Sequence, residues 1–118
     1  MVIFKRKLTR QLDEWRTKVG RLPLILWGAR QVGKSTTIEA FGKHRFERTH
    51  VFNFQKTPSL KTVFSGDLNP REILQRLSLV GKNAIAPEDL VFFDEIQECP
   101  EAVTSLKYFS EGLPGQAV

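Results

Sequence analysis

Residues 24–35 read Leu-Ile-Leu-Trp-Gly-Ala-Arg-Gln-Val-Gly-Lys-Ser. The run Leu24–Trp27 is apolar throughout and stops at Gly28, which is typical of a short strand buried on both faces. The segment Ser35–Phe41 has no helix breaker until Gly42, so it predicts a helix that ends there. A glycine-bounded loop therefore joins a buried strand to a helix, which indicates the start of a layered α/β structure.

The rest of the chain predicts helices and strands in alternation. The first predicted helix has an apolar stripe of Phe4, Leu8, Leu12, Trp15 and Val19 and ends at Gly20. After the phosphate-loop region come a strand at Val51–Phe54, a helical turn that reaches Phe64, and a helix that begins with Asn69 as its cap, Pro70 in the first position and Glu72 bonding back, and that ends at Gly81. The last elements are a strand at Leu90–Phe93, a helix from Pro100 to Gly112 and the beginning of a strand at Gln116–Val118. None of the strands alternates with polar residues, so we expect an α/β fold with a mainly parallel sheet. We divide the chain into an N-terminal amphipathic helix, residues 1–22, and an α/β part, residues 23–118.

The loop between the first strand and its helix matches a phosphate-binding pattern. Gly28–Ser35 fits G-x-x-x-x-G-K-[ST] at every defining position, between a strand and a helix as the mechanism requires. The pattern predicts a P-loop NTPase-type fold in which backbone N–H groups and the helix N-terminus surround a phosphate. The residues that we expect to contact the nucleotide are Gly28, Ala29, Arg30, Gln31, Val32, Gly33, Lys34, Ser35 and Thr36.

Lys34 and Ser35 of the loop, together with Asp94 and Glu95, form the predicted site for the phosphates of ATP and for Mg²⁺. Lys34 can reach the β and γ phosphates, and the Ser35 hydroxyl can ligate Mg²⁺. Asp94 and Glu95 follow the strand Leu90–Phe93, and the carboxyl ends of parallel strands meet at one edge of the sheet. We therefore expect Asp94 to hold Mg²⁺ and Glu95 to orient or deprotonate the water that attacks the γ-phosphate. Lys34 and Glu95 are the predicted catalytic residues.

Four stretches of the sequence carry a resemblance to a known family. They are Pro23–Ser35, Asn53-Phe54, Asp94–Pro100 and Ser105–Phe109. With these stretches the chain resembles the prokaryotic AAA-superfamily ATPases that carry a second, poorly characterised C-terminal domain. The Arg-Gln-Val insert of the loop and the string Asp-Glu-Ile-Gln-Glu-Cys-Pro are the parts most specific to that family. Ser35 stands where the family usually has threonine, and Gln55 where it usually has an acidic residue.

The resemblance implies a three-layer sandwich with sheet order 5-1-4-3-2 and ATP hydrolysis by the complete protein. In that order the fourth strand lies between the phosphate-loop strand and the Asp-Glu strand. Gln116–Val118 would only begin the fourth strand, so we expect an incomplete domain with an empty slot beside Leu90–Phe93 and negligible ATP turnover by this chain alone. A homo-oligomer is compatible with the full-length form. Two alternatives stay open: a truncated remnant that at most binds nucleotide, and an ATPase that acts on nucleic acid.

Composition and charge narrow the class of protein. The chain has 118 residues, 41% of them hydrophobic, which is enough for the core of one domain. The net charge is +5, and residues 1–50 hold the basic excess, which suits nucleic acid, a bound polyphosphate or simply a solvated helix face.

No apolar run approaches the roughly 20 residues of a membrane span, and the N-terminus lacks a secretory pattern, so we expect a cytoplasmic protein without a membrane partner. A single cysteine, Cys99, excludes an internal disulfide and a cysteine-cluster metal site.

Two weaker signals concern single polar residues. Asn53 interrupts an apolar run. It either hydrogen-bonds Glu95, and so holds this carboxylate away from water until a partner binds, or it lies on the polar face of its strand. His44 and His50 have no clustered partners in the sequence, so we expect both at the surface.

Overall fold

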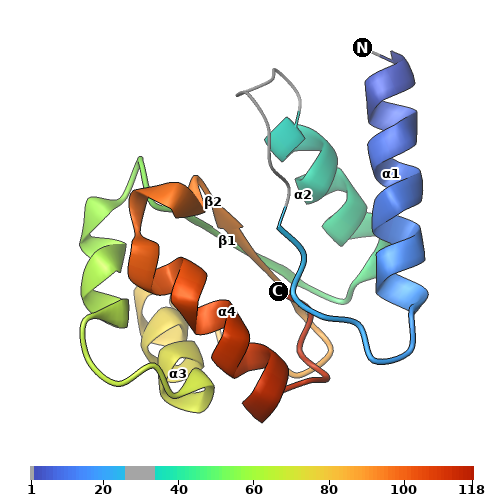
Figure 1. Ribbon diagram of the computed structural model, residues 1–118. Helices are drawn as coiled ribbons and strands as arrows, with labels where there is room; N and C mark the ends of the chain where they lie inside the picture. Colours follow the sequence, from blue (N-terminus) through green and yellow to red (C-terminus); the bar gives the residue numbers. More distant parts are fainter. Residues whose placement is uncertain (1, 26–33) are drawn as a thin grey trace.

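The computed structural model describes residues 2–25 and 34–118 and has an α/β architecture (Figure 1). The elements are α1 (Val2–Thr17), α2 (Lys34–Arg45), β1 (Thr49–Asn53), η1 (Pro58–Phe64), α3 (Pro70–Gly81), β2 (Leu90–Asp94), η2 (Ile96–Glu98) and α4 (Pro100–Gly112). The predicted fold class is confirmed. Within the described ranges, no helix combines the length and the apolar character needed to cross a bilayer.

The centre of the fold is the parallel pair of strands β1 and β2. Their register runs from Thr49 opposite Leu90 to Asn53 opposite Asp94. The helices α1 and α2 lie on one side of this pair, whereas α3, α4 and η1 lie on the other (Figure 1). The three layers expected from the sequence are therefore present, around two strands among the described residues.

Alternation along β2 sends its side chains into two separate cores. Leu90 and Phe92 pack with α1 and α2, in a cluster that contains Leu8, Leu12, Ile38 and Phe41. Val91 and Phe93 pack on the opposite face with α3, α4 and η1, in a cluster that contains Ile73, Leu77, Leu106 and Phe109. Because both faces are covered, β2 has no polar alternation, as is typical of parallel strands.

Phe93 joins four elements of the larger core. Its ring lies 5.7 Å from the ring centres of Phe54 and Phe64, 6.3 Å from that of Phe52 and 6.4 Å from that of Phe109. Three of these contacts are edge-to-face, the arrangement that the aromatic quadrupole favours by about 0.5–1.5 kcal/mol per pair. Packing around Phe93 thus fixes β2 relative to η1 and α4.

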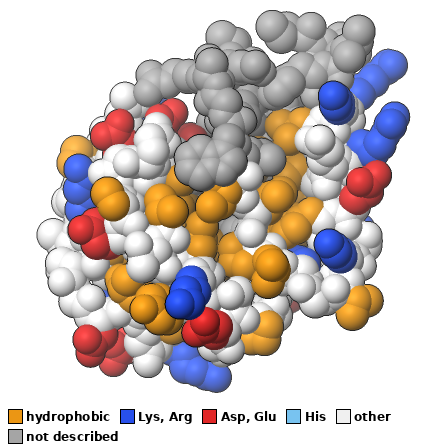
Figure 2. Space-filling model, viewed as in Figure 1, with side chains coloured by type: hydrophobic (Ala, Val, Ile, Leu, Met, Phe, Trp, Pro, Cys, Tyr) orange, Lys and Arg blue, Asp and Glu red, His pale blue; other side chains and the backbone are white. Residues whose placement is uncertain are grey.

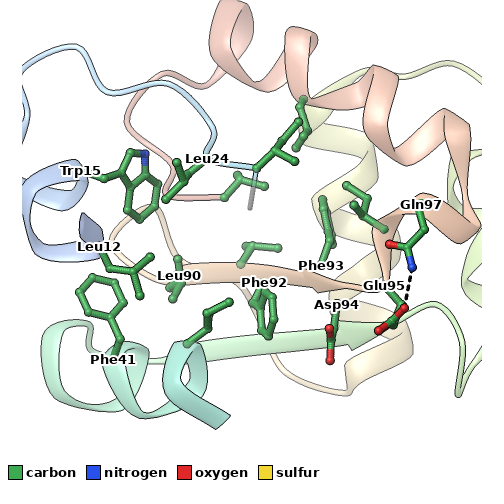
Figure 3. Close-up of a pocket in the computed structure, with 16 residues that line it drawn as sticks. Leu12, Trp15, Leu24, Phe41, Leu90, Phe92, Phe93, Asp94, Glu95 and Gln97 are labelled. Atoms are coloured by element: carbon green, nitrogen blue, oxygen red, sulfur yellow. Dashed lines mark hydrogen bonds between the residues drawn. The ribbon is translucent and has the colours of Figure 1, made fainter. Parts of the chain in front are cut away.

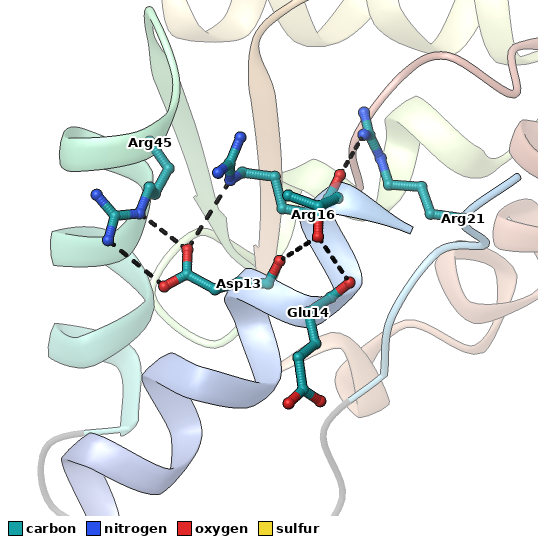
Figure 4. Close-up of polar contacts among 6 residues, drawn as sticks. Asp13, Glu14, Arg16, Arg21 and Arg45 are labelled. Carbon is teal, nitrogen blue, oxygen red and sulfur yellow. Dashed lines mark hydrogen bonds and ion pairs between the residues drawn. The ribbon is translucent and has the colours of Figure 1, made fainter. Parts of the chain in front are cut away.

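The helix α1 is attached to α2 by charge as well as by apolar contacts. Arg45 Nε donates to Asp13 Oδ1 at 2.8 Å and Arg45 Nη2 donates to Asp13 Oδ2 at 3.4 Å (Figure 4). The hydrogen bond from Arg45 lowers the pKa of Asp13 below its usual value. The pair therefore stabilises the fold at pH values above the ordinary aspartate pKa. This contribution is lost as the pH falls through the lowered pKa of Asp13 in the folded protein.

The residues at the C-terminus lie between β2 and the segment that precedes residue 26. Ala117 forms a parallel bridge with Leu90, and Val91 N donates to Ala117 O at 2.9 Å. On the other side, Leu24 N donates to Val118 O at 3.3 Å. The slot implied by the resemblance is thus entered by Gln116–Val118. Of the predicted strand Leu24–Trp27, Leu24 and Ile25 have no regular secondary structure, and residues 26–27 lie outside the described residues.

Three local predictions were wrong because packing overrides local signals. The helix α2 continues through Gly42 to Arg45, since Gly42 lies against Thr49 and serves close packing instead of ending the helix. Val19 lies beyond the end of α1 and is 97% exposed, so it is not part of the apolar stripe. His50 is buried, with Nε2 2.9 Å from Asp89 Oδ2, because β1 and β2 bring these residues together.

We predict that Gly42→Ala destabilises the protein, although alanine favours helices. A Cβ at position 42 would collide with Thr49 Oγ1 and lie 2.9 Å from Thr49 Cγ2 and 3.0 Å from Leu90 Cδ2. The overpacking should outweigh the gain in helix propensity, for a net loss of about 1–2 kcal/mol in the free energy of unfolding, measured by urea denaturation. The matched control is Gly66→Ala, where a Cβ meets nothing within 4 Å. Equal stabilities of the two variants would contradict the close approach of α2 and β1.

Candidate functional site

The position of Asp94 follows from the alternation of β2. Asp94 is the last residue of the strand, and its side chain lies on the same face as Leu90 and Phe92. That face is covered by α2, whose first turn contains Ser35. A carboxylate at the end of β2 is therefore directed toward the N-terminus of α2, where the helix dipole favours negative charge.

Ser35 and Asp94, predicted from separate motifs, are in contact. Ser35 Oγ donates to Asp94 Oδ2 at 3.0 Å, although 59 positions separate the two residues in the sequence. The contact places a hydroxyl oxygen beside a carboxylate oxygen. Both are hard oxygen donors, of the kind that Mg²⁺ uses in proteins.

Asn53 supplies a second donor to the same carboxylate oxygen. Its Nδ2 donates to Asp94 Oδ2 at 3.2 Å, as expected for residues paired across β1 and β2. Its Oδ1 accepts from the backbone N–H groups of Gln55 and Lys56, each at 2.9 Å, and so closes the turn after β1. The amide of Asn53 thus contacts Asp94, not Glu95 as the switch hypothesis required.

Glu95 leaves the strand in a different direction from Asp94. Its φ of 57° is in the left-handed region, which costs a residue other than glycine roughly 1–2 kcal/mol. Gln97 Nε2 donates to Glu95 Oε2 at 2.6 Å (Figure 3). The two adjacent carboxylates therefore have different partners and can serve different roles.

The described structure contains only part of the predicted phosphate loop. Gly28, Ala29, Arg30, Gln31, Val32 and Gly33 lie outside the described residues. Lys34 is the first residue of α2, and Thr36 lies exposed in the first turn of that helix. The structure thus brings Ser35 and Asp94 together at the start of α2, and it adds Asn53 as a partner of Asp94 and Gln97 as a partner of Glu95.

Cys99 belongs to the core. It is fully buried at the start of α4, and desolvation raises the pKa of its thiol. Among the described residues, no group of three or more His, Cys, Asp or Glu side chains is placed to hold a metal ion.

A comparison with known families identifies the family of the chain. A family model described as AAA domain matches residues 20–117. The chain belongs to this family of AAA domains. No curated protein and no solved structure matches it. The predicted family is confirmed for the AAA portion, and the second, C-terminal domain stays a prediction.

Sequence reasoning identified Ser35 and Asp94 but not every contact of this AAA domain. The role of Asn53 as a donor to Asp94 depends on the register of β1 against β2, which the sequence does not state. The contact of Gln97 with Glu95 depends on the left-handed turn at Glu95. The only sequence signal for these two residues was an amide side chain at or just after the end of a predicted strand.

We predict that Asn53→Ala lowers the free energy of unfolding by about 1–2 kcal/mol, because two backbone N–H groups and Asp94 lose a partner. Asn53→Asp keeps the acceptor for the turn but places a second carboxylate beside Asp94. It should be the less stable variant at neutral pH, because two like charges then lie side by side.

The measurement is urea unfolding of both variants and of the parent at neutral pH. The control is Asn83→Ala, whose amide contacts only the Gly81 carbonyl in an exposed turn and should change stability by less than about 0.5 kcal/mol. Asn53→Asp with the stability of the parent at neutral pH would show that residue 53 is not beside Asp94.

Proposed function

We propose that this AAA domain binds Mg·ATP where α2 begins and β2 ends. The observation that carries the proposal is the contact of Ser35 Oγ with Asp94 Oδ2 at 3.0 Å. Membership of the AAA family supports a nucleotide-binding, ATPase-like function in general. The residues of the site are assigned by the sequence motifs together with this contact.

The donor set of the site fits magnesium. The Ser35 hydroxyl and the Asp94 carboxylate offer two oxygen atoms close to each other, on elements that are held by the core. We assign both residues to the ion, Asp94 either directly or through water. When bound, Mg²⁺ would supply positive charge that offsets the charge of the phosphates. Asn53 would keep the Asp94 side chain in position through its amide.

The phosphates themselves are assigned to the loop and to the N-terminus of α2. Gly28–Gly33 would supply backbone N–H groups, and Lys34 would supply a positive charge to the β and γ phosphates. The first turn of α2 contains no acidic residue of its own, and the partial positive charge of its N-terminus, toward which Asp94 is directed, would also favour the phosphates.

Glu95 is the residue that we propose for orienting the attacking water. It follows Asp94 directly, but the left-handed turn gives its carboxylate a separate partner in Gln97. Because the two carboxylates have different partners, we assign Asp94 to the metal and Glu95 to the proton of the attacking water. In this proposal hydrolysis is an activity of the complete domain.

We predict that Lys34→Ala weakens binding of a fluorescent ATP analogue in the presence of Mg²⁺ at least about tenfold. The loss of one charge-assisted hydrogen bond, about 1.5–3 kcal/mol, is worth that factor or more. The matched control is Lys43→Ala, an exposed lysine in the last turn of the same helix, which should leave the Kd unchanged. Unaltered affinity in Lys34→Ala would rule out the phosphate site.

The metal assignment has its own test in the magnesium dependence of binding. The ratio of the Kd for ATP in EDTA to the Kd in Mg²⁺ should fall toward one in Ser35→Ala, because a metal ligand is lost. Ser35→Thr keeps the hydroxyl and should keep the ratio of the parent. If Ser35→Ala has the same ratio as the parent, Ser35 is not a metal ligand even where ATP still binds.

A further inference from the structure

The outer side of α1 carries positive charge along its N-terminal half. Residues 1–10 hold four Lys or Arg residues and no Asp or Glu, whereas the two acidic residues of the helix lie in its second half. Arg6, Lys7 and Arg10 are exposed, and we call these three residues the basic patch. Figure 2 shows Lys and Arg side chains along the edge of the molecule that α1 forms, on the right of the view.

The helical repeat directs the two arginines of the patch to solvent. Leu8 and Leu12 are buried in the core with α2 and β2, so they mark the inner side of α1. Arg6 and Arg10 precede and follow Leu8 by two residues, which is slightly more than half a helical turn, and so they point away from the core. They are neighbours on the outer side, about 6 Å apart along the helix axis.

No carboxylate neutralises the basic patch. Among the described residues, Arg16, Arg45 and Arg76 form ion pairs with carboxylates, whereas no residue of the patch does. Asp13, the first acidic residue of α1, is already bound by Arg45 (Figure 4). The positive charge of the patch is therefore available to a ligand outside the chain.

Stability of the helix does not explain these charges. Like charges four residues apart, as in Arg6 and Arg10, destabilise a helix. The first turn of α1 contains no acidic residue, so nothing there complements the partial positive charge of the helix N-terminus. The cations and the helix dipole thus add to one positive field, which is the arrangement that a polyanion would favour.

The surroundings of the patch narrow the class of polyanion. A helix that lies on a membrane inserts its apolar side, but the apolar side of α1 is already packed against α2 and β2. Proteins that bind single-stranded nucleic acid stack its bases on aromatic side chains. Among the described residues the large aromatic side chain that is exposed is Tyr108, which belongs to α4 on the other side of the sheet.

We propose that the basic patch binds the phosphate backbone of double-stranded nucleic acid without reading its sequence. Guanidinium groups match the geometry of phosphate oxygens, and a row of cations along one helix can follow a row of phosphates along one strand. The inference does not depend on nucleotide binding. Because α1 and α2 pack together and begin at the same end of the molecule (Figure 1), the duplex and Mg·ATP need separate measurements.

The test is fluorescence anisotropy of a labelled DNA duplex with the whole chain, in EDTA and without nucleotide. With three phosphate contacts, a plot of log K against log salt concentration should have a slope of about −2.7. Arg6→Gln combined with Arg10→Gln should reduce the magnitude of this slope by about 1.8 and weaken binding at least about tenfold at about 0.1 M salt. Its midpoint of urea unfolding should be no lower than that of the parent, because repulsion between the arginines is removed.

The matched control is Lys61→Gln combined with Lys107→Gln. These lysines are exposed on η1 and α4, on the other side of the sheet, and the control changes the net charge by the same amount. It should keep the slope and the affinity of the parent. An equal loss of affinity in the control, or an unchanged slope in the variant of the patch, overturns the proposal.

Three competition arms separate the duplex from other polyanions. Tighter binding to vesicles of anionic phospholipid would assign the patch to a membrane surface, and tighter binding to a single strand would assign it to unpaired nucleic acid. Complete displacement of the duplex by equimolar Mg·ATP would assign it to the phosphates of the nucleotide. Each of these three results overturns the proposal, whereas preference for the duplex in all three arms supports it.

Discussion

The parallel pairing of β1 with β2 is the constraint on which the rest of the structure depends. It sets Asn53 opposite Asp94, and the pleat then sends Asp94 to the face that α2 covers. The same pairing divides the apolar residues of β2 between two cores, one for α1 and α2 and one for α3, α4 and η1. A shift of one residue would move Asp94 to the α4 face and would bury it among phenylalanine rings.

The hydrogen bonds at Asp94 hold a carboxylate in place without neutralising it. The Ser35 hydroxyl and the Asn53 amide are both uncharged donors, so they orient Asp94 Oδ2 and leave its negative charge available to a cation. By contrast, Asp13 is paired with a guanidinium and serves to attach α1 to α2. The partners of the two aspartates therefore differ in charge, which suits the binding role that we propose for Asp94 and the structural role of Asp13.

Elements that begin with a strong local signal could be predicted from the sequence. The helix α3 begins at Pro70 with Asn69 Oδ1 accepting from Arg71 N at 3.0 Å, and α4 begins at Pro100, as expected for proline in a first turn. The pairing of Ser35 with Asp94 was also predictable, because carboxyl ends of parallel strands and helix N-termini meet at one edge. Features that depend on distant contacts were not predictable, among them Gly42 against Thr49 and the buried pair of His50 with Asp89.

The C-terminal residues hold the segment that leads into the proposed phosphate loop. Val118 O accepts from Leu24 N, and Gly115 O accepts from Arg21 Nη2 at 3.1 Å, so the segment that leads into residue 26 is bonded to the end of the chain. That end is in turn bonded to β2, through Ala117 O to Val91 N and through Gln116 Nε2 to Asp89 O at 2.8 Å. The path from Arg21 to Asp94 thus consists of backbone and side-chain hydrogen bonds and one short strand. Moving Ala117 away from β2 would therefore disturb both the segment that leads into residue 26 and the strand that carries Asp94.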